Sequence, residues 1–168
     1  GLGDVYKRQV LEIAATSYGF AMVTYTGQNL GANQPKRIRE GLKAGVIIAL
    51  ITSTVLGAIL ILLGKPLLSL FISGTEEEIS QTLAIAYHYL SIMSVCLPIL
   101  YVLYVLRSTL QGLGDTVSPM LSGVAEFAMR TGCVLLLPLW LEAEGIFYAE
   151  VLAWTGADLV LIPSCIWA

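Results

Sequence analysis

Four charged side chains interrupt apolar stretches of this sequence, and they are the residues best placed to do chemistry. Glu126 and Arg130 stand four positions apart, and Glu150 and Asp158 stand eight apart with Trp154 between them. A charge in the middle of a membrane costs about 2.5 to 3.5 kcal/mol or more, so such residues usually face a cavity or a charged partner. These positions are therefore the first candidate site for ion coupling or for a substrate cavity.

The spacing of these residues predicts how they are grouped. Residues four apart share one face of a helix, which allows an ion pair between Glu126 and Arg130. That pair is either a neutralised packing contact or a carboxylate whose protonation breaks the pair and moves the helix. Glu150, Trp154 and Asp158 also share a face and resemble the wall of a cavity that receives cations. Asp158 is the deeper acid, and it either couples ion movement or forms a structural hydrogen bond.

A polar patch near the end of the first apolar stretch is the second candidate. It consists of Tyr25, Thr26, Gln28 and Asn29, and it includes the glycine pair Gly27 and Gly31. Glycines four positions apart allow two helices to approach closely. The patch is interpreted either as a packing face with satisfied polar groups or as part of the cavity wall.

Other kinds of chemistry find no support in the sequence. There is no nucleophile with a partnered base, no metal-ligand pair and no phosphate-binding glycine loop, so we expect no catalytic residue, no metal, no cofactor and no enzyme activity. The three cysteines lie in apolar runs without CxxC spacing and are expected in the core. The net charge is −3 and the basic residues form no stripe with aromatics, which excludes a nucleic-acid partner.

The composition indicates which elements hold these residues. Of 168 residues, 57% are hydrophobic and 12% are charged, against about a quarter charged in soluble domains. A chain of this size buries only about 70% of its surface, so a water-soluble fold would expose large apolar patches. The lipid bilayer is therefore the expected surrounding.

Five apolar stretches are long enough to cross that bilayer. They cover roughly residues 10–32, 43–64, 82–106, 117–141 and 145–168. About 20 residues of helix span the hydrocarbon core. We therefore predict an all-α, polytopic transmembrane bundle over residues 10–168, and we interpret the polar residues 1–9 as a non-native or truncated edge.

Details of the breaks predict where helices end and bend. The second stretch is expected to end at Gly64, with Pro66 in the first turn of an interfacial segment, and Thr75 or Ser80 could cap the next helix, with Glu78 completing a capping box with Thr75. Kinks are expected at Pro98 and Pro138.

The charges between the stretches predict the orientation. The first break contains Lys36, Arg37, Arg39 and Lys43, and Arg107 is assigned to the third, whereas the second and fourth contain glutamates. By the positive-inside rule the first and third breaks and the C-terminus are cytoplasmic. Five spans then begin outside the membrane, so further helices are expected upstream.

Two segments carry a family resemblance. GQNLGANQPKRIREGLKAG at 27–45 and LQGLGDTVSPMLSGVAEFAMR at 110–130 resemble the multidrug and toxic compound extrusion (MATE) family, and the tail at 145–164 is similar to its last helix. The resemblance implies a twelve-helix transporter of two lobes, of which this chain would be about helices eight to twelve. It also implies a location in the plasma (inner) membrane and an N-terminal lobe as partner.

The resemblance further implies antiport, in which entry of H⁺ or Na⁺ drives export of an amphipathic or cationic small molecule. Gln28 and Gly31 match a motif that closes the eighth helix, and Gly112, Gly114 and Asp115 match the loop after the tenth, as structural or gating positions. Some branches bind a cation at an acid in the tenth helix. No acid lies between Glu78 and Asp115 here, so a site of that type is not expected.

Two other functions stay open. A lipid-linked oligosaccharide flippase of the same superfamily would need a basic cavity for a pyrophosphate, for which the sequence offers Arg130. The chain could also be a truncated membrane fragment that does not transport by itself.

Overall fold

The computed structural model describes residues 2–70, 76–141 and 144–167. The described residues form helices and no strands, which confirms the all-α class. The helices are α1 (Leu2–Gly31), α2 (Pro35–Ser69), α3 (Glu76–Gly112), α4 (Val117–Leu136), the short α5 (Pro138–Leu141) and α6 (Glu144–Trp167).

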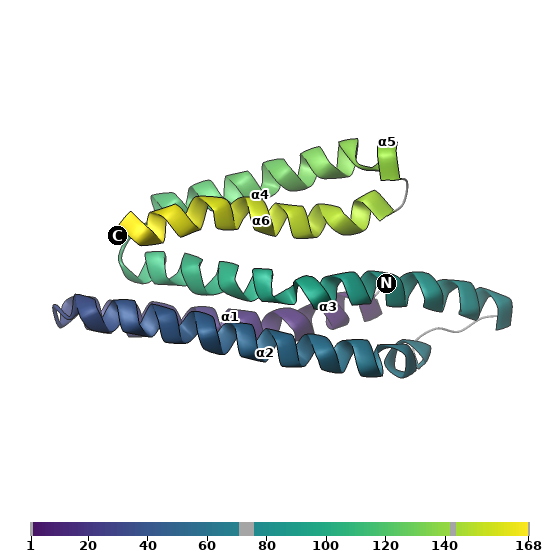
Figure 1. Cartoon of the computed structure of the whole chain (residues 1–168), viewed down its shortest axis with the longest axis horizontal. Helices are drawn as coiled ribbons and strands as arrows, with labels where there is room; N and C mark the ends of the chain where they lie inside the picture. Colours follow the sequence, from purple (N-terminus) through teal and green to yellow (C-terminus); the bar gives the residue numbers. More distant parts are fainter. Residues whose placement is uncertain (1, 71–75, 142–143, 168) are drawn as a thin grey trace.

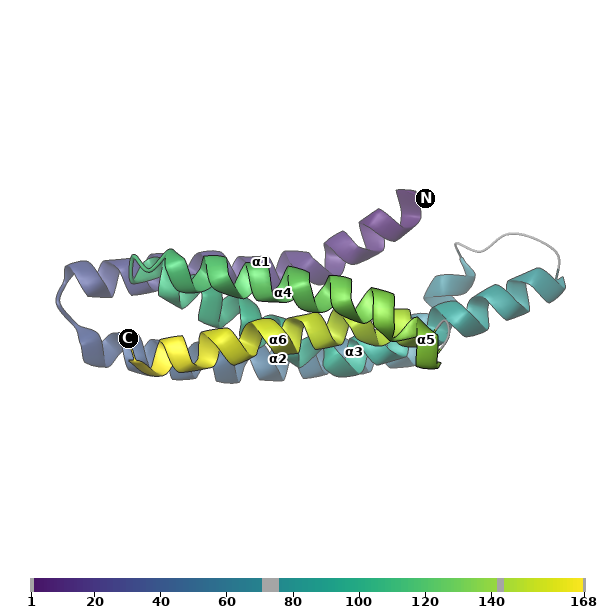
Figure 2. The same ribbon diagram turned by 90° about the horizontal axis from the view of Figure 1, so that it is seen from above.

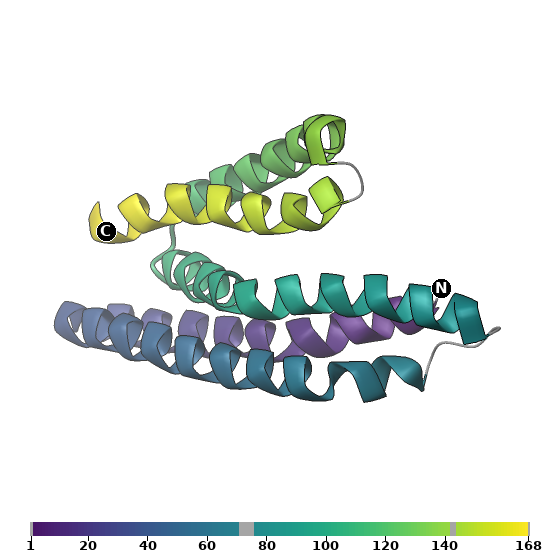
Figure 3. The same ribbon diagram turned by 45° about the vertical axis from the view of Figure 1, so that its right-hand side comes forward.

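Helix α3 is the centre of the bundle. α1 and α2 pack on one side of it, and α4 and α6 pack together on the other side (Figures 1 and 3). Tyr101, Val105 and Leu110 of α3 are fully buried because they have neighbours on both sides. The α1–α2 turn, the α3–α4 turn and the C-terminal end of α6 lie at one end of the bundle, as Figures 1 and 2 both show.

The outer surface is apolar, as expected for a protein surrounded by lipid. Phe20, Leu62, Phe127 and Ile166 are each more than 70% exposed. Exposing such an apolar surface to water is unfavourable, whereas contact with lipid tails is not. Among the described residues, three helical segments are long and apolar enough to cross a membrane: Pro35–Ser69, Glu76–Gly112 and Phe147–Ile166. α1 and α4 are not among the three, and they carry the polar patch and the Glu126–Arg130 pair.

The helices differ from the predicted spans at their ends. α2 continues past Gly64 through Pro66 to Ser69, so the prediction of a helix end at Gly64, with Pro66 in a first turn, was wrong. Near this segment α2 is bonded to α3, because the Tyr87 hydroxyl of α3 donates to the Ile61 carbonyl of α2 at 2.8 Å. The proposed cap at Thr75 lies outside the described residues.

Three further boundaries also changed. α3 includes Arg107 and ends at Gly112, so the assignment of Arg107 to a loop was wrong. At Pro138 the chain does more than kink, because α4 ends at Leu136 and α5 begins at Pro138. Helix α1 begins at Leu2 and therefore includes residues 2–9, whose interpretation as a non-native edge stays a prediction.

Candidate functional site

A chain of ion pairs connects α3, α4 and α6. Arg107 donates through Nη2 to Glu126 Oε2 at 3.0 Å, and Arg130 donates through Nη2 to Glu126 Oε1 at 2.9 Å. Arg130 also forms an ion pair with Glu150 of α6 at 3.0 Å. The Glu126–Arg130 pair predicted from the spacing is therefore present, and both of its members have a second partner from another helix.

Arg107 is held in place by a hydroxyl as well as by the carboxylate. Its Nε and Nη2 lie 3.2 and 3.1 Å from Ser122 Oγ, and that hydroxyl donates to the Pro119 carbonyl. The sequence interpretation missed Arg107 because it assigned this residue to a loop. Arg107 directly follows an apolar run and stands 19 residues before Glu126. Its place at the end of that run was the signal in the sequence that a helix could include it.

The predicted face of α6 turns toward the interior. The Trp154 side chain is 4% exposed and Asp158 is 8% exposed. Asp158 Oδ1 is buried and accepts no hydrogen bond from any described residue. The charged groups whose fields act on Asp158 are Arg107 and Glu126. A carboxylate in this position is costly unless it binds a proton, a cation or a donor.

The charges of this cluster do not balance. Arg107 and Arg130 supply two positive charges, whereas Glu126, Glu150 and Asp158 supply three carboxyl groups. When all of them are ionised, one negative charge remains. The cluster therefore carries one carboxyl group more than it has arginines.

A cavity of about 280 Å³ opens beside the Arg130–Glu150 pair. Its walls include the rings of Tyr89 and Phe147, whose centroids lie 5.1 Å apart. Aromatic faces next to a carboxylate attract organic cations. The cavity is thus lined by two aromatic rings and by the Arg130–Glu150 ion pair.

The polar patch of α1 lies on the other side of α3 from the ion pairs. The Tyr25 hydroxyl donates to the Arg37 carbonyl at 3.0 Å, and Asn29 Nδ2 donates to the Tyr25 carbonyl at 2.8 Å. Gln28 is exposed, while Thr26 is buried and its hydroxyl has no partner among the described residues. The structure therefore does not bring the two candidate groups together.

The close approach of α1 to α3 depends on Gly112 more than on the predicted glycine pair. A Cβ on Gly112 would lie 2.7 Å from Thr26 Cβ and 2.9 Å from the Val23 carbonyl oxygen. A Cβ on Gly27 would meet only the Gly112 carbonyl at 3.8 Å, and one on Gly31 would meet nothing within 4 Å. Gly112 is thus required for packing.

The remaining motif residues build the turn between α3 and α4. Gly114 has a φ of +83°, which other residues rarely adopt. Asp115 Oδ1 accepts hydrogen bonds from the amides of Val117 at 2.9 Å and Ser118 at 3.1 Å, and so caps α4. Hydrogen bonds from the Ser118 side chain and backbone hold the pKa of Asp115 below its usual value. These contacts account for a structural role.

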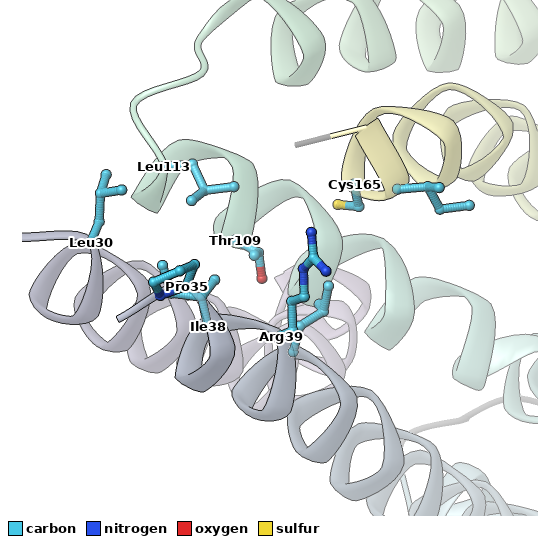
Figure 4. A pocket seen from close by; sticks show the side chains of 9 residues that line it. Leu30, Pro35, Ile38, Arg39, Thr109, Leu113 and Cys165 are labelled. Carbon is cyan, nitrogen blue, oxygen red and sulfur yellow. The ribbon is translucent and has the colours of Figure 1, made fainter. Parts of the chain in front are cut away.

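A second cavity of about 140 Å³ lies at the end of the bundle that contains the α1–α2 turn. Figure 4 shows Arg39 of α2 reaching into it toward α3 and α6, close to Thr109 and Cys165. Its wall is largely apolar, from Leu30, Ile38, Leu42, Leu113 and Ile166.

The fold is similar to that of a solved membrane protein. A solved structure titled "Lipid II flippase MurJ, inward closed conformation" matches with a TM-score of 0.72 and 15% sequence identity, over 96% of this chain and 34% of that chain. This chain therefore spans about a third of the length of that protein, and the likeness concerns the fold. Among curated proteins no sequence matches.

A family comparison adds evidence from the sequence itself. The MatE family model matches residues 9–131, which is most of the chain. The match includes α2, α3 and the ion-paired part of α4 as far as Arg130. The chain belongs to the MatE family of membrane transporters.

Proposed function

We propose that this chain is part of a secondary active antiporter that exports amphipathic or cationic compounds in exchange for H⁺ or Na⁺. The observation that carries the proposal is Asp158, a carboxyl group nine-tenths buried in a membrane helix, with Oδ1 lacking a donor among the described residues. A buried acid of this kind is a group that can change its charge during transport.

The surroundings of Asp158 support exchange of a positive ion. The five charged groups of the cluster leave one carboxylate in excess, so a proton or Na⁺ would neutralise it. The cavity at the Arg130–Glu150 end of the cluster has the rings of Tyr89 and Phe147 in its wall, and aromatic rings of this kind suit an organic cation. A coupling ion and a cationic substrate would then compete for the same negative charge.

Transport needs more chain than is present here. A path across the membrane forms between two lobes in transporters with repeated architecture. We therefore propose that this chain acts together with an N-terminal lobe, in the plasma membrane, and that by itself it does not transport.

A lipid-linked oligosaccharide flippase is the second candidate, and the likeness in fold to MurJ favours it. An anionic pyrophosphate would require basic groups to receive it. Arg107 and Arg130 both already pair with carboxylates, and each has a side chain about a quarter to a third exposed. The excess of acid in the cluster favours a cationic substrate instead.

The test is export by the complete transporter that contains this chain, reconstituted in vesicles. Under an imposed pH gradient, Asp158→Asn should abolish efflux of a cationic dye, while the exposed control Glu40→Gln should keep it. Near-normal efflux by Asp158→Asn would reject the coupling role. A Na⁺ gradient and a pH gradient, applied separately, identify the ion.

A second assay in the same vesicles separates exporter from flippase. Translocation of a fluorescent lipid with a pyrophosphate headgroup is measured beside dye efflux. Lipid translocation without dye export would replace the antiporter proposal by the flippase.

A further inference from the structure

The Arg107 guanidinium has N–H donors that no described residue accepts. All its hydrogen bonds to described residues come from Nε and Nη2, which contact Ser122 and Glu126. No bond from Nη1 to another described residue is present. Because a guanidinium carries five N–H donors in a rigid fork, Nη1 can serve another acceptor without giving up Glu126.

Asp158 is the acceptor that matches these donors. α6 packs against α3, α4 and α5. From α3 the charged group acting on Asp158 is Arg107, and from α4 it is Glu126. Arg130 of α4 already has two carboxylate partners, and Glu150, two turns earlier on α6, is one of them. The α5 sequence PLWL has no charge.

The geometry points to competition between Arg107 and a monovalent cation for the Asp158 carboxylate. When Asp158 is ionised and binds no cation, Nη1 of Arg107 donates to it, and α3 is tied to α6 as well as to α4. When a proton or Na⁺ occupies the carboxylate, that bond is absent and Arg107 remains on Glu126 and Ser122. In the structure Arg107 contacts Glu126 and Ser122, and Oδ1 of Asp158 lacks a donor among the described residues, as the second arrangement requires.

This inference rests on the proposed function and gives it a structural consequence. Arg107 lies on α3, the central helix, and Asp158 lies on α6, which packs on α4. Cation binding would therefore remove one hydrogen bond, from Arg107 to Asp158, between the two sides of the bundle. A substitution of either partner should alter the response to the cation without any substrate being present.

The experiment uses the whole chain in lipid nanodiscs, without transport. Trp154 lies one helical turn before Asp158 and is buried, so its fluorescence reports on this contact. Trp140→Phe and Trp167→Phe leave it as the single tryptophan. We expect its emission to change in one transition during a pH titration. Asp158→Asn should abolish the transition, and Asp158→Glu, which keeps an acid in place, should retain it if the fold is intact.

The Arg107→Gln variant tests the competition itself. Without the guanidinium, Asp158 loses the nearby positive charge that opposes its protonation, so the transition should move to higher pH by about one unit or more. Loss of Arg107 also leaves Glu126 with less neutralisation, which acts in the same direction. An unchanged midpoint in Arg107→Gln, or a transition that survives in Asp158→Asn, would overturn the inference. Circular dichroism verifies that each variant is folded.

His88 supplies the matched control. It is the single histidine in the chain, and histidine is the side chain type best known as a pH switch in proteins. The transition should persist in His88→Gln, and its disappearance there would assign it to His88 and overturn the inference. Adding Na⁺, with choline at equal ionic strength as the comparison, separates the two cations. A shift to lower pH in Na⁺ supports competition that includes Na⁺, and no shift supports competition by the proton alone.

The outcomes keep this inference separate from the function. If Asp158→Asn removes the fluorescence transition but the complete transporter still exports dye, the competition stands and the coupling role fails. If pH-driven export depends on Asp158 but Arg107→Gln leaves the midpoint unchanged, the coupling stands and the competition fails.

Discussion

Each central residue of the ion-pair chain has two charged partners. Glu126 receives bonds from Arg107 and Arg130, and Arg130 contacts Glu126 and Glu150. Loss of Glu126 therefore leaves Arg130 with Glu150 and takes the carboxylate of this chain from Arg107, and loss of Arg130 leaves Glu126 with Arg107. Removing one member of a pair leaves the other member with a desolvated charge that the pair no longer compensates, whereas removing both members avoids that cost for the pair itself.

The first prediction concerns the Glu126–Arg130 pair. In a double-mutant cycle, Glu126→Gln and Arg130→Gln should be non-additive, and the double variant should lose about 0.5 to 1 kcal/mol less stability than the sum of the single losses. The modest size follows because the two side chains are 20% and 31% exposed. The measurement is the free energy of unfolding in mixed detergent micelles.

A control pair is available on α2. Lys36 and Glu40 have the same spacing and are exposed. Their substitutions should be additive. Additive losses at Glu126 and Arg130 as well would count against an energetic pair there.

At this scale the sequence predicted what lies on one helix. The Glu126–Arg130 pair and the shared face of Glu150, Trp154 and Asp158 follow from helical spacing alone. The bonds of Arg107 to Glu126 and of Arg130 to Glu150 cross between helices. Local spacing has no information on such contacts, which depend on how α3, α4 and α6 pack.

At the scale of the elements, a proline and a glycine explain how α2 packs on α3. Pro98 lies inside α3 and has no N–H to donate to the Ser94 carbonyl four residues earlier. That carbonyl oxygen instead approaches Gly57 of α2, where an added Cβ would lie only 2.5 Å away. The glycine therefore gives space to a backbone group that the proline leaves without its helical donor.

The second prediction follows from this contact. Gly57→Ala should separate α2 from α3, because the obstructing atom belongs to the backbone and cannot rotate away. The control is Gly123→Ala on α4, where an added Cβ meets nothing within 4 Å. Both substitutions change helix propensity equally, so Gly57→Ala should be less stable than Gly123→Ala by about 1 to 3 kcal/mol, the usual cost of overpacking.

Thermal unfolding in detergent measures the difference between these two variants. Equal stability would show that α2 shifts at no cost. A second readout is a disulfide between cysteines introduced on facing positions of the two helices, whose formation should slow in Gly57→Ala.

The ends of the helices were predicted less accurately than their existence. Apolar stretches identified each long helix, because composition reports which residues tolerate lipid. Composition does not report where a helix ends, since a helix can continue into water or past a proline supported by a neighbour. α2 passing through Pro66 and α3 passing through Arg107 are both of this kind.

At the scale of the whole molecule, the long helices alternate in direction. The turn at residues 32–34 and the turn at residues 113–116 therefore lie at the same end of the bundle (Figure 1). The end of α2, the start of α3 and the start of α6 lie at the opposite end. The structure thus groups the loops in the way that the charge pattern predicted, and it does so without specifying which end is cytoplasmic.

The last prediction assigns that end. Lys36, Arg37 and Arg39 follow the first turn and are exposed, whereas the start of α3 carries Glu76 and Glu77. Basic residues near short loops are retained in the cytoplasm. Reporter fusions at Arg37 and Asp115 should therefore report the cytoplasm, and fusions at Glu77 and Glu144 the exterior.

Arg107 does not contribute to the orientation because it is paired inside the bundle, so the orientation depends on the basic cluster of the first turn. When Lys36, Arg37, Arg39 and Lys43 are neutralised together, the cytoplasmic reporters should give a weaker signal or report both sides of the membrane. Arg107→Gln should leave all the reporter signals unchanged. A reversed pattern in the unmodified chain would contradict the orientation, and a pattern that depends on Arg107 would show that the orientation has another cause.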